Sequence, residues 1–173
     1  DTPDAPVTPE SLKGAQEVIR SRIDQLGVKE PIVQTQGDRR IIVELAGVQD
    51  PQEAIRIIGK TALLEFRGPD GTTELYGSEL KNAQATINPQ DNQAEVHLEF
   101  QPKGAEKFAE MTTKYVGQQI AIYLDGEVLT APVVNEPIPD GNAVISGGYA
   151  SLQEAEHDAI MLRSGSLPVK MEM

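Results

Sequence analysis

The spacing of apolar residues predicts a helix as the first regular element of the chain. Five apolar residues recur at intervals of three or four, as residues on one helix face do: Leu12, Ala15, Ile19, Ile23 and Leu26. Thr8 precedes a proline and an acid, the arrangement typical of an N-cap. Gly27 is placed to end the helix in a left-handed conformation. The pattern therefore predicts a helix over residues 9–26.

The next residues predict a hairpin, a short helix and a strand. Residues 31–36 and 40–45 are rich in Ile and Val and are separated by Gly-Asp-Arg, which predicts two paired strands. Asp50 opens a capping-box pattern, D-P-Q-E, before a short helix that ends by residue 59. Residues 62–66 alternate between apolar and other side chains, as in a strand. This order resembles a ferredoxin-like βαββαβ sandwich without its first strand. That strand would either precede Asp1 in a longer parent chain or come from another segment.

A second block follows the turn signal Gly-Pro-Asp-Gly at residues 68–71. Asp125-Gly126 is a two-residue hairpin signal, and Ser151 opens another capping box. The block is predicted to contain strands at 83–87, 94–100, 120–124, 128–134 and 143–146, and helices at 103–116 and 151–164.

The last seven residues alternate again, with Leu167, Val169, Met171 and Met173 separated by polar residues or proline. We expect them to form a strand that returns to the sheet of the first block. The predicted fold class is therefore α+β. A ferredoxin-like base, residues 1–68 plus 166–173, is completed by the C-terminal strand, and an α+β head, residues 69–165, is inserted into it.

Composition narrows the possible functions. The 173 residues include no cysteine, which excludes disulfides and thiolate chemistry, and 27 acids against 15 bases give a formal charge of −12. Nucleic acid and anionic lipid are poor partners for such a chain. No apolar run approaches the roughly 20 residues that cross a bilayer, so the chain as given is expected to be soluble, whatever its parent protein is.

No pattern of catalytic or metal-binding residues is present. His97 and His157 fall in different elements, and both are expected to face solvent. Glu95 and Glu99 share a strand face with His97, but residues two apart are spaced widely for a single metal, so a polar outer face is favoured. Neither a nucleophile elbow nor a phosphate-binding loop occurs. We therefore expect a non-enzymatic chain with no catalytic residue, no metal and no cofactor.

Several segments in order resemble the first large ectodomain of the SecD family of protein-export membrane proteins. The resemblance runs from about residue 15 to 169 and is weakest near 69–92. The segments that carry it are V-I-R-S-R-I-D-Q-L-G-V from Val18, R-I-I-V-E-L-A-G-V from Arg40, T-A-L-L-E-F-R from Thr61, I-A-I-Y-L-D-G from Ile120, I-S-G-G-Y from Ile145 and L-R-S-G-S-L-P-V from Leu162.

The resemblance implies a role in preprotein export. Members of the family act with SecF beside the SecYEG translocon, on the outer face of the inner membrane, and use the proton gradient. Their proton-carrying acids lie in membrane helices that this segment lacks. The resemblance therefore implies a periplasmic domain whose head binds the emerging unfolded chain and moves relative to its base.

Specific residues follow from this interpretation. Hinges are expected at the two crossings between base and head, Gly68-Pro69 and Ser164-Gly165, although these residues would also serve as ordinary turns and caps. Preprotein contact is expected at Tyr123, Val128, Val133 and Val134, with core packing as the alternative. Two rival functions stay open: a small-molecule-binding regulatory module of ferredoxin-like fold, and an acyl-phosphate hydrolase, which would need an Arg-bearing loop after the missing first strand.

Overall fold

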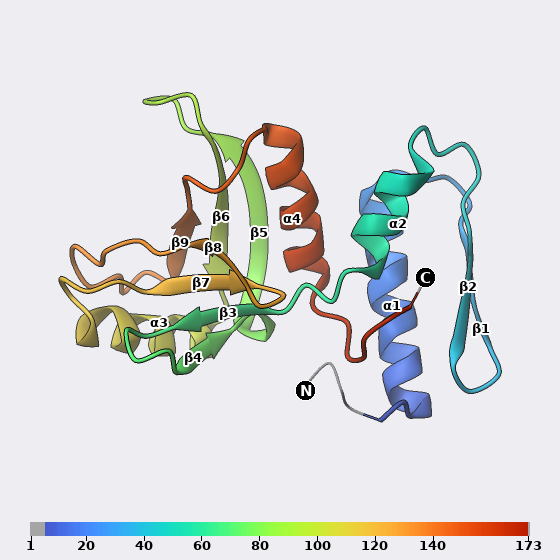
Figure 1. The fold of residues 1–173 in the computed structure, drawn as a ribbon, viewed down its shortest axis with the longest axis horizontal. Coiled ribbons are helices and arrows are strands. Elements are labelled where there is room, and N and C mark those ends of the chain that lie inside the picture. Colours follow the sequence, from blue (N-terminus) through green and yellow to red (C-terminus); the bar gives the residue numbers. More distant parts are fainter. Residues whose placement is uncertain (1–5, 173) are drawn as a thin grey trace. The chain divides into compact units, whose positions relative to one another are not determined.

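The computed structural model describes residues 6–172, which form two compact units (Figure 1). Unit 1 combines Asp1–Ala62 with Ser164–Met173, and unit 2 is Leu63–Arg163. The chain thus leaves unit 1 after Ala62 and returns to it at Ser164. Within residues 6–172, no helix has both the length and the apolar character needed to cross a membrane.

Unit 1 is built from two helices and one hairpin, followed by the C-terminal segment. Its elements are α1 (Pro9–Gln25), β1 (Ile32–Gln36), β2 (Arg40–Glu44) and α2 (Pro51–Gly59). The strands β1 and β2 pair antiparallel and form a sheet of their own. These four elements confirm the sequence prediction for residues 9–59 to within two residues at each end.

The start of α1 shows how local chemistry sets a helix boundary. The Thr8 hydroxyl accepts a hydrogen bond from the Ser11 amide at 3.1 Å, and the Ser11 hydroxyl accepts one from the Thr8 amide at 2.8 Å. Both amides would otherwise be unpaired at the helix end. At the other end Gly27 has a φ of 72°, which a residue with a side chain rarely adopts. The helix is therefore delimited by short-range interactions alone.

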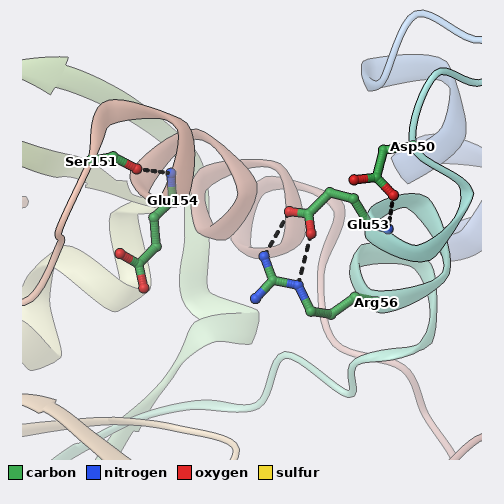
Figure 2. Close-up of polar contacts among 5 residues, drawn as sticks. All are labelled: Asp50, Glu53, Arg56, Ser151 and Glu154. Atoms are coloured by element: carbon green, nitrogen blue, oxygen red, sulfur yellow. Dashed lines mark hydrogen bonds and ion pairs between the residues drawn. The ribbon is translucent and has the colours of Figure 1, made fainter.

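The other two predicted N-caps are also present (Figure 2). The Asp50 carboxylate accepts the Glu53 amide at 3.0 Å, and the Ser151 hydroxyl accepts the Glu154 amide at 3.2 Å. The reciprocal half of the capping box does not form at α2. Instead, the Glu53 carboxylate takes two hydrogen bonds from the Arg56 guanidinium, at 2.6 and 3.1 Å, because the two side chains face each other one turn apart.

The C-terminal segment packs into unit 1 without forming a strand. Leu167 and Val169 are buried in the same core as Ile19, and the Leu167 amide donates to the Thr61 carbonyl at 2.8 Å. Burial of each side chain contributes about 1.5–3 kcal/mol. No ladder with β1 or β2 is formed by residues 165–172. The prediction that a C-terminal strand completes the sheet is therefore wrong: side-chain burial, not backbone pairing, fixes this segment.

Unit 2 contains two antiparallel sheets and two α-helices (Figure 1). One sheet has the order β4-β3-β7-β8 and the other β5-β6-β9. The elements are β3 (Leu64–Arg67), β4 (Thr73–Tyr76), the 3-10 turn η1 (Gly77–Glu79), β5 (Leu80–Ile87), β6 (Ala94–Phe100), α3 (Pro102–Lys114), β7 (Ala121–Leu124), β8 (Glu127–Thr130), β9 (Asn142–Ile145) and α4 (Leu152–Ser164).

The strand β3 belongs to unit 2, not to the base where sequence analysis put it. It pairs with β4 on one side and with β7 on the other, and Leu64, Glu65 and Phe66 are all buried. Its alternating pattern predicts a strand but does not specify the partners, which lie up to about 60 residues away. The ferredoxin-like sheet of the base is consequently absent from the described residues, where unit 1 has only the β1–β2 hairpin. β4 was not predicted.

Three phenylalanines join the two sheets of unit 2 to α3. Phe66 of β3 lies 5.5 Å from Phe100 of β6 and 5.9 Å from Phe108 of α3, and the last two are 4.9 Å apart. All three are buried. Aromatic pairs at these separations add about 0.5–1.5 kcal/mol each beyond the burial of their surface. This cluster fixes the position of α3 against both sheets.

Candidate functional site

Unit 2 contains a cavity of about 480 Å³. Its lining comes from β3, α3, β7, β9 and the segment that leads into β9. The lining residues are Phe66, Phe108, Thr112, Ile120, Ile122, Pro132, Val133, Val134, Asn135, Glu136, Ile138, Asp140, Asn142, Ala143 and Val144.

The apolar part of this lining continues from the core to the surface. Phe66, Phe108 and Ile122 are buried, whereas Val133 is 50% and Val144 41% exposed. A continuous apolar lining that reaches solvent is a surface on which an apolar group can be buried. The cavity can therefore take up an apolar side chain from outside the molecule.

One wall of the cavity is anchored by Thr112. This threonine is 1% exposed; its hydroxyl donates to the Phe108 carbonyl at 2.8 Å and accepts the Ile138 amide at 3.0 Å. The segment before β9 is thereby attached to α3 through one buried hydroxyl. Removing that hydroxyl would leave the Ile138 amide without its acceptor.

Gly141 allows the same wall to pass close to α3. Its φ is 72°, and a Cβ atom there would lie 2.6 Å from the Cβ of Ala105. The Gly141 carbonyl accepts the Phe100 amide at 2.9 Å, which fixes the start of β9 beside β6. Both the backbone conformation and the close approach require glycine at this position.

The strand β9 borders the cavity with a free edge. Within residues 6–172, β9 pairs with β6 alone, and Asn142, Ala143 and Val144 belong to the cavity lining. An unpaired strand edge next to an apolar cavity can accept an extended chain as an additional strand.

Two carboxylates, Glu136 and Asp140, are the charged groups of the lining. Asp140 accepts the Asn142 amide at 3.2 Å, and its pKa is lowered by hydrogen bonds from the Asn142 side chain and backbone. The Asp140 carboxylate is therefore ionised at neutral pH.

The four residues expected to contact preprotein divide into two pairs. Val133 and Val134 line the cavity, with Val134 only 8% exposed. Tyr123 and Val128 are cross-strand partners on β7 and β8, so they share the face of the sheet opposite to buried Ile122. Val128 is 56% exposed there. Only the first pair belongs to the cavity.

The expected hinge residues Gly68 and Pro69 lie inside unit 2, in the turn between β3 and β4. Gly68 is buried, and a Cβ there would lie 2.6 Å from the Tyr115 hydroxyl. That hydroxyl and the Lys114 ammonium both donate to the Glu74 carboxylate. Burial acts to raise the pKa of Glu74, but these two hydrogen bonds outweigh it and leave the pKa lowered. The turn is thus part of a packed, hydrogen-bonded cluster.

The crossing from unit 1 to unit 2 is held on both sides of Ala62. The Arg22 guanidinium donates to the Lys60 carbonyl, and the Leu63 amide donates to the Asp125 carboxylate at 2.8 Å. Ala62 itself has a φ of 58°, an uncommon conformation for a residue with a side chain.

The return crossing lies between Arg163 and Gly165. Arg163 donates to the Ala83 carbonyl at 3.0 Å in unit 2, and the Gly165 carbonyl accepts from Arg22 at 3.0 Å in unit 1. Ser164 accepts a hydrogen bond from Gln25 at 2.7 Å. The two expected hinge residues Ser164 and Gly165 therefore lie at a crossing, and Gly165 has a φ of 85°.

Arg22 connects both crossings on the side of unit 1. Its guanidinium is fully buried and donates to five carbonyl oxygens. The acceptors are those of Ile57, Ile58, Lys60, Thr61 and Gly165. Two of them belong to the last turn of α2, where carbonyls have no partner within the helix. In the sequence Arg22 lies three residues after Ile19 and four before Leu26, so helical spacing puts it at the edge of the apolar face, which is the signal that indicates its burial.

The two histidines lie on different elements, His97 on β6 and His157 on α4. Within residues 6–172, no group of three metal-ligating side chains is present. His97 is half exposed and bonds the Glu95 carboxylate at 2.6 Å. The prediction of solvent exposure is wrong for Glu95, which is 8% exposed, and for His157, which is half-buried. Alternation along β6 predicted a polar outer face, but Asn88 and His97 cover Glu95 there.

Comparison with known proteins identifies both parts of the chain. The family model for the SecDF P1 head subdomain matches residues 60–169. The model for the N-terminal part of the P1 domain of protein translocase subunit SecDF matches residues 12–71.

Individual relatives agree with these matches. The chain is 50% identical over its whole length to protein translocase subunit SecD of Acidaminococcus fermentans and covers 41% of that protein. It is 38% identical to SecDF of Thermus thermophilus over 96% of its length, covering 28% of that protein. The chain thus spans about two fifths of the SecD relative and less of SecDF.

Solved structures show the same fold. A crystal structure of SecDF in a super-membrane-facing form matches with a TM-score of 0.90 at 36% identity, over 98% of this chain and 28% of that one. A second structure, from work describing SecDF as a membrane component that enhances protein export, matches with a TM-score of 0.85 at 36% identity, over 98% of this chain and 92% of that one. The chain therefore belongs to the SecD/SecDF family of protein translocase subunits and corresponds to its P1 domain.

Proposed function

We propose that this chain is the extracytoplasmic domain of a translocase subunit and assists preprotein export by holding the emerging unfolded segment in unit 2. The cavity bordered by the free edge of β9 carries this proposal. Unit 2 would also move relative to unit 1, and in the parent protein the proton-motive force would drive this movement.

A free strand edge suits a domain that must bind segments of many different sequences. Antiparallel pairing uses main-chain groups, which every polypeptide presents, and an adjoining apolar cavity adds the burial of one or two side chains. Burial of one large apolar side chain contributes about 1.5–3 kcal/mol, which gives weak and reversible binding. Reversible binding is required if the segment is to be released after each step of export.

The crossings supply the pivot in this proposal. Each crossing is anchored to unit 1 on one side and to unit 2 on the other, through the Lys60 carbonyl and the Leu63 amide at the first and through Gly165 and the Arg163 side chain at the second. A rotation between the units would be absorbed by the few backbone torsions between these anchors. The pivot therefore lies at Ala62 and at Ser164-Gly165. Gly68 and Pro69 remain hinge candidates from sequence, but the packing of Gly68 against Tyr115 does not favour them.

The proposed role is non-enzymatic and needs no cofactor. The unfolded preprotein is the direct partner, and SecF and SecYEG are partners through the parent membrane protein. The domain would act on the periplasmic face of the inner membrane. The names of the relatives, protein translocase subunits, support this assignment.

Site-specific photo-cross-linking to an unfolded preprotein peptide tests the binding site. Val133 and Val128 are a matched pair, since both are exposed valines of unit 2 and only Val133 lines the cavity. A photoreactive side chain at Val133 is expected to cross-link the peptide, and the same group at Val128 is not. Cross-linking at Val128 alone would move the site to the opposite face of the sheet.

The rival function, a small-molecule-binding module, is favoured only by the size of the cavity, which falls within the range of ligand pockets. NMR titrations with the same peptide and with a metabolite panel separate the two. Saturable shifts of the cavity residues with metabolites, and none with the peptide, would reject the export function.

The pivot is tested by distance measurements between spin labels. Because the chain has no cysteine, Glu17→Cys in unit 1 and Glu110→Cys in unit 2 would carry the only two labels. Both positions are exposed. A broad or multimodal distance distribution is expected, and a single narrow one would contradict the proposed movement.

A further inference from the structure

The two carboxylates of the cavity have no cationic partner among the described residues. Within residues 6–172, Glu136 and Asp140 form no ion pair, and no Lys, Arg or His lines the cavity. Four of the six Lys and Arg side chains of unit 2 form ion pairs away from the cavity. The pairs are Arg67 with Glu65, Lys81 with Glu99, Lys107 with Glu79 and Lys114 with Glu74.

Unit 2 as a whole is also negatively charged, like the two carboxylates of its cavity. Unit 2, Leu63–Arg163, contains 16 acidic and six basic residues, a formal charge of −10 out of the −12 of the chain. A negative field over the unit attracts cations, and two uncompensated carboxylates at the cavity make the attraction local. Any segment bound at the cavity therefore experiences a negative potential.

We propose that the cavity prefers extended segments in which an apolar residue is flanked by Lys or Arg. The apolar side chain would occupy the cavity between Phe108, Ile122 and Val134, and a basic side chain next to it would reach Glu136 or Asp140 at the wall. Long basic side chains suit this arrangement because their stems lie along apolar surface while the charge stays in water. This inference rests on the proposed function and specifies its substrate class.

The expected preference is moderate, because both carboxylates are exposed to solvent. Exposed ion pairs contribute little each, so a peptide that pairs with both carboxylates should bind about 3- to 10-fold more tightly than its neutral analogue at low salt. Most of that preference should disappear at about 0.5 M salt, where the screening length is a few Å.

The test measures fluorescence anisotropy of three labelled peptides with the 173-residue chain. The peptides share one apolar core, flanked by Lys, Gln or Glu. The variant Glu136→Gln/Asp140→Asn removes both charges from the cavity while Asn retains the oxygen that accepts the Asn142 amide. The control Asp91→Asn/Glu156→Gln removes the same charge from unit 2 at exposed positions outside the cavity, and Asp91 accepts the Gln93 amide in the same way.

The Lys-flanked peptide is expected to bind most tightly, the Gln-flanked peptide less tightly and the Glu-flanked peptide least. This order should be lost in the cavity variant and kept in the control variant. Equal binding of all three peptides would overturn the charge preference and leave the proposed function intact. An equal loss of preference in both variants would overturn it as well, since the general field of unit 2 would then be sufficient. If no peptide bound, the proposed function itself would fail.

Discussion

Replacing Arg22 with methionine removes the donor that connects five backbone carbonyls of unit 1. The guanidinium is fully buried and donates at 3.0 Å to Ile57, Ile58 and Gly165, and also to Lys60 and Thr61. Methionine retains most of the apolar stem, so the substitution isolates the loss of the hydrogen bonds. We expect unit 1 to be strongly destabilised and both crossings to loosen.

The magnitude follows from the carbonyls left behind. A buried carbonyl without a donor costs about 1–3 kcal/mol, and at least those of Ile57 and Ile58 become such groups. Part of this cost is offset because the buried guanidinium no longer has to be desolvated. Two such carbonyls cost about 2–6 kcal/mol before this offset, which is a large fraction of the roughly 5–15 kcal/mol that stabilises a domain. We therefore expect Arg22→Met to cost about 3–5 kcal/mol.

Urea unfolding followed by circular dichroism measures this cost. With a slope of about 1–3 kcal/mol per molar urea, the midpoint of the unit 1 transition should fall by at least about 1 M. Hydrogen exchange adds a local readout, because the Leu167 amide is bonded to the Thr61 carbonyl beside Arg22. That amide should exchange faster in the variant.

Arg20 provides the matched control. It lies on the same helix, is exposed, and makes one hydrogen bond to the Val33 carbonyl at 3.3 Å. Arg20→Met should cost less than about 1 kcal/mol. Arg22→Lys should give an intermediate loss, since an ammonium cannot reach carbonyls on both crossings. An Arg22→Met variant as stable as Arg20→Met would refute the reasoning.

Three further substitutions test the cavity and its surroundings. Thr112→Val should cost about 1–3 kcal/mol in urea unfolding, because it leaves the partly buried Ile138 amide of the cavity wall without its acceptor, and it should weaken peptide binding. Gly141→Ala should destabilise unit 2 by more than about 1 kcal/mol, since it combines a positive φ with a clash against Ala105; unchanged stability would contradict the close approach. Because the pKa of Glu74 is lowered in the folded state, its ionised form stabilises the fold above the unfolded pKa of about 4.3, and this stabilisation is lost as the pH falls through the folded pKa. The stability difference between wild type and Glu74→Gln should therefore be present at pH 7 and shrink toward pH 3, and a difference independent of pH would count against the pairing with Lys114.

Only part of the candidate site can be predicted from the sequence. The sequence predicts preprotein contact or core packing for Val133 and Val134, and both line the cavity. Tyr123 and Val128, chosen on the same grounds, lie on the opposite face of the sheet. The pattern of each strand gives its two faces, but which face adjoins a cavity depends on how two sheets and α3 pack together.

The sequence by itself determined the elements whose boundaries depend on neighbouring residues. Caps at Thr8, Asp50 and Ser151 start three helices, and the Asp125-Gly126 pair, with φ of 53° and 83°, forms the turn between β7 and β8. In each case the donor or the left-handed residue lies within three positions of the group it serves, so local chemistry is sufficient.

Only the tertiary structure determined which distant segments of the chain pair or pack with one another. It assigned β3 to the sheet of unit 2, held Leu167 and Val169 in the core of unit 1 without a strand, and buried Arg22 beneath both crossings. These outcomes depend on contacts between residues up to 143 positions apart, as between Arg22 and Gly165. An alternating pattern specifies that a side chain is to be buried but carries no information about which distant segment buries it, because burial of apolar surface has no direction.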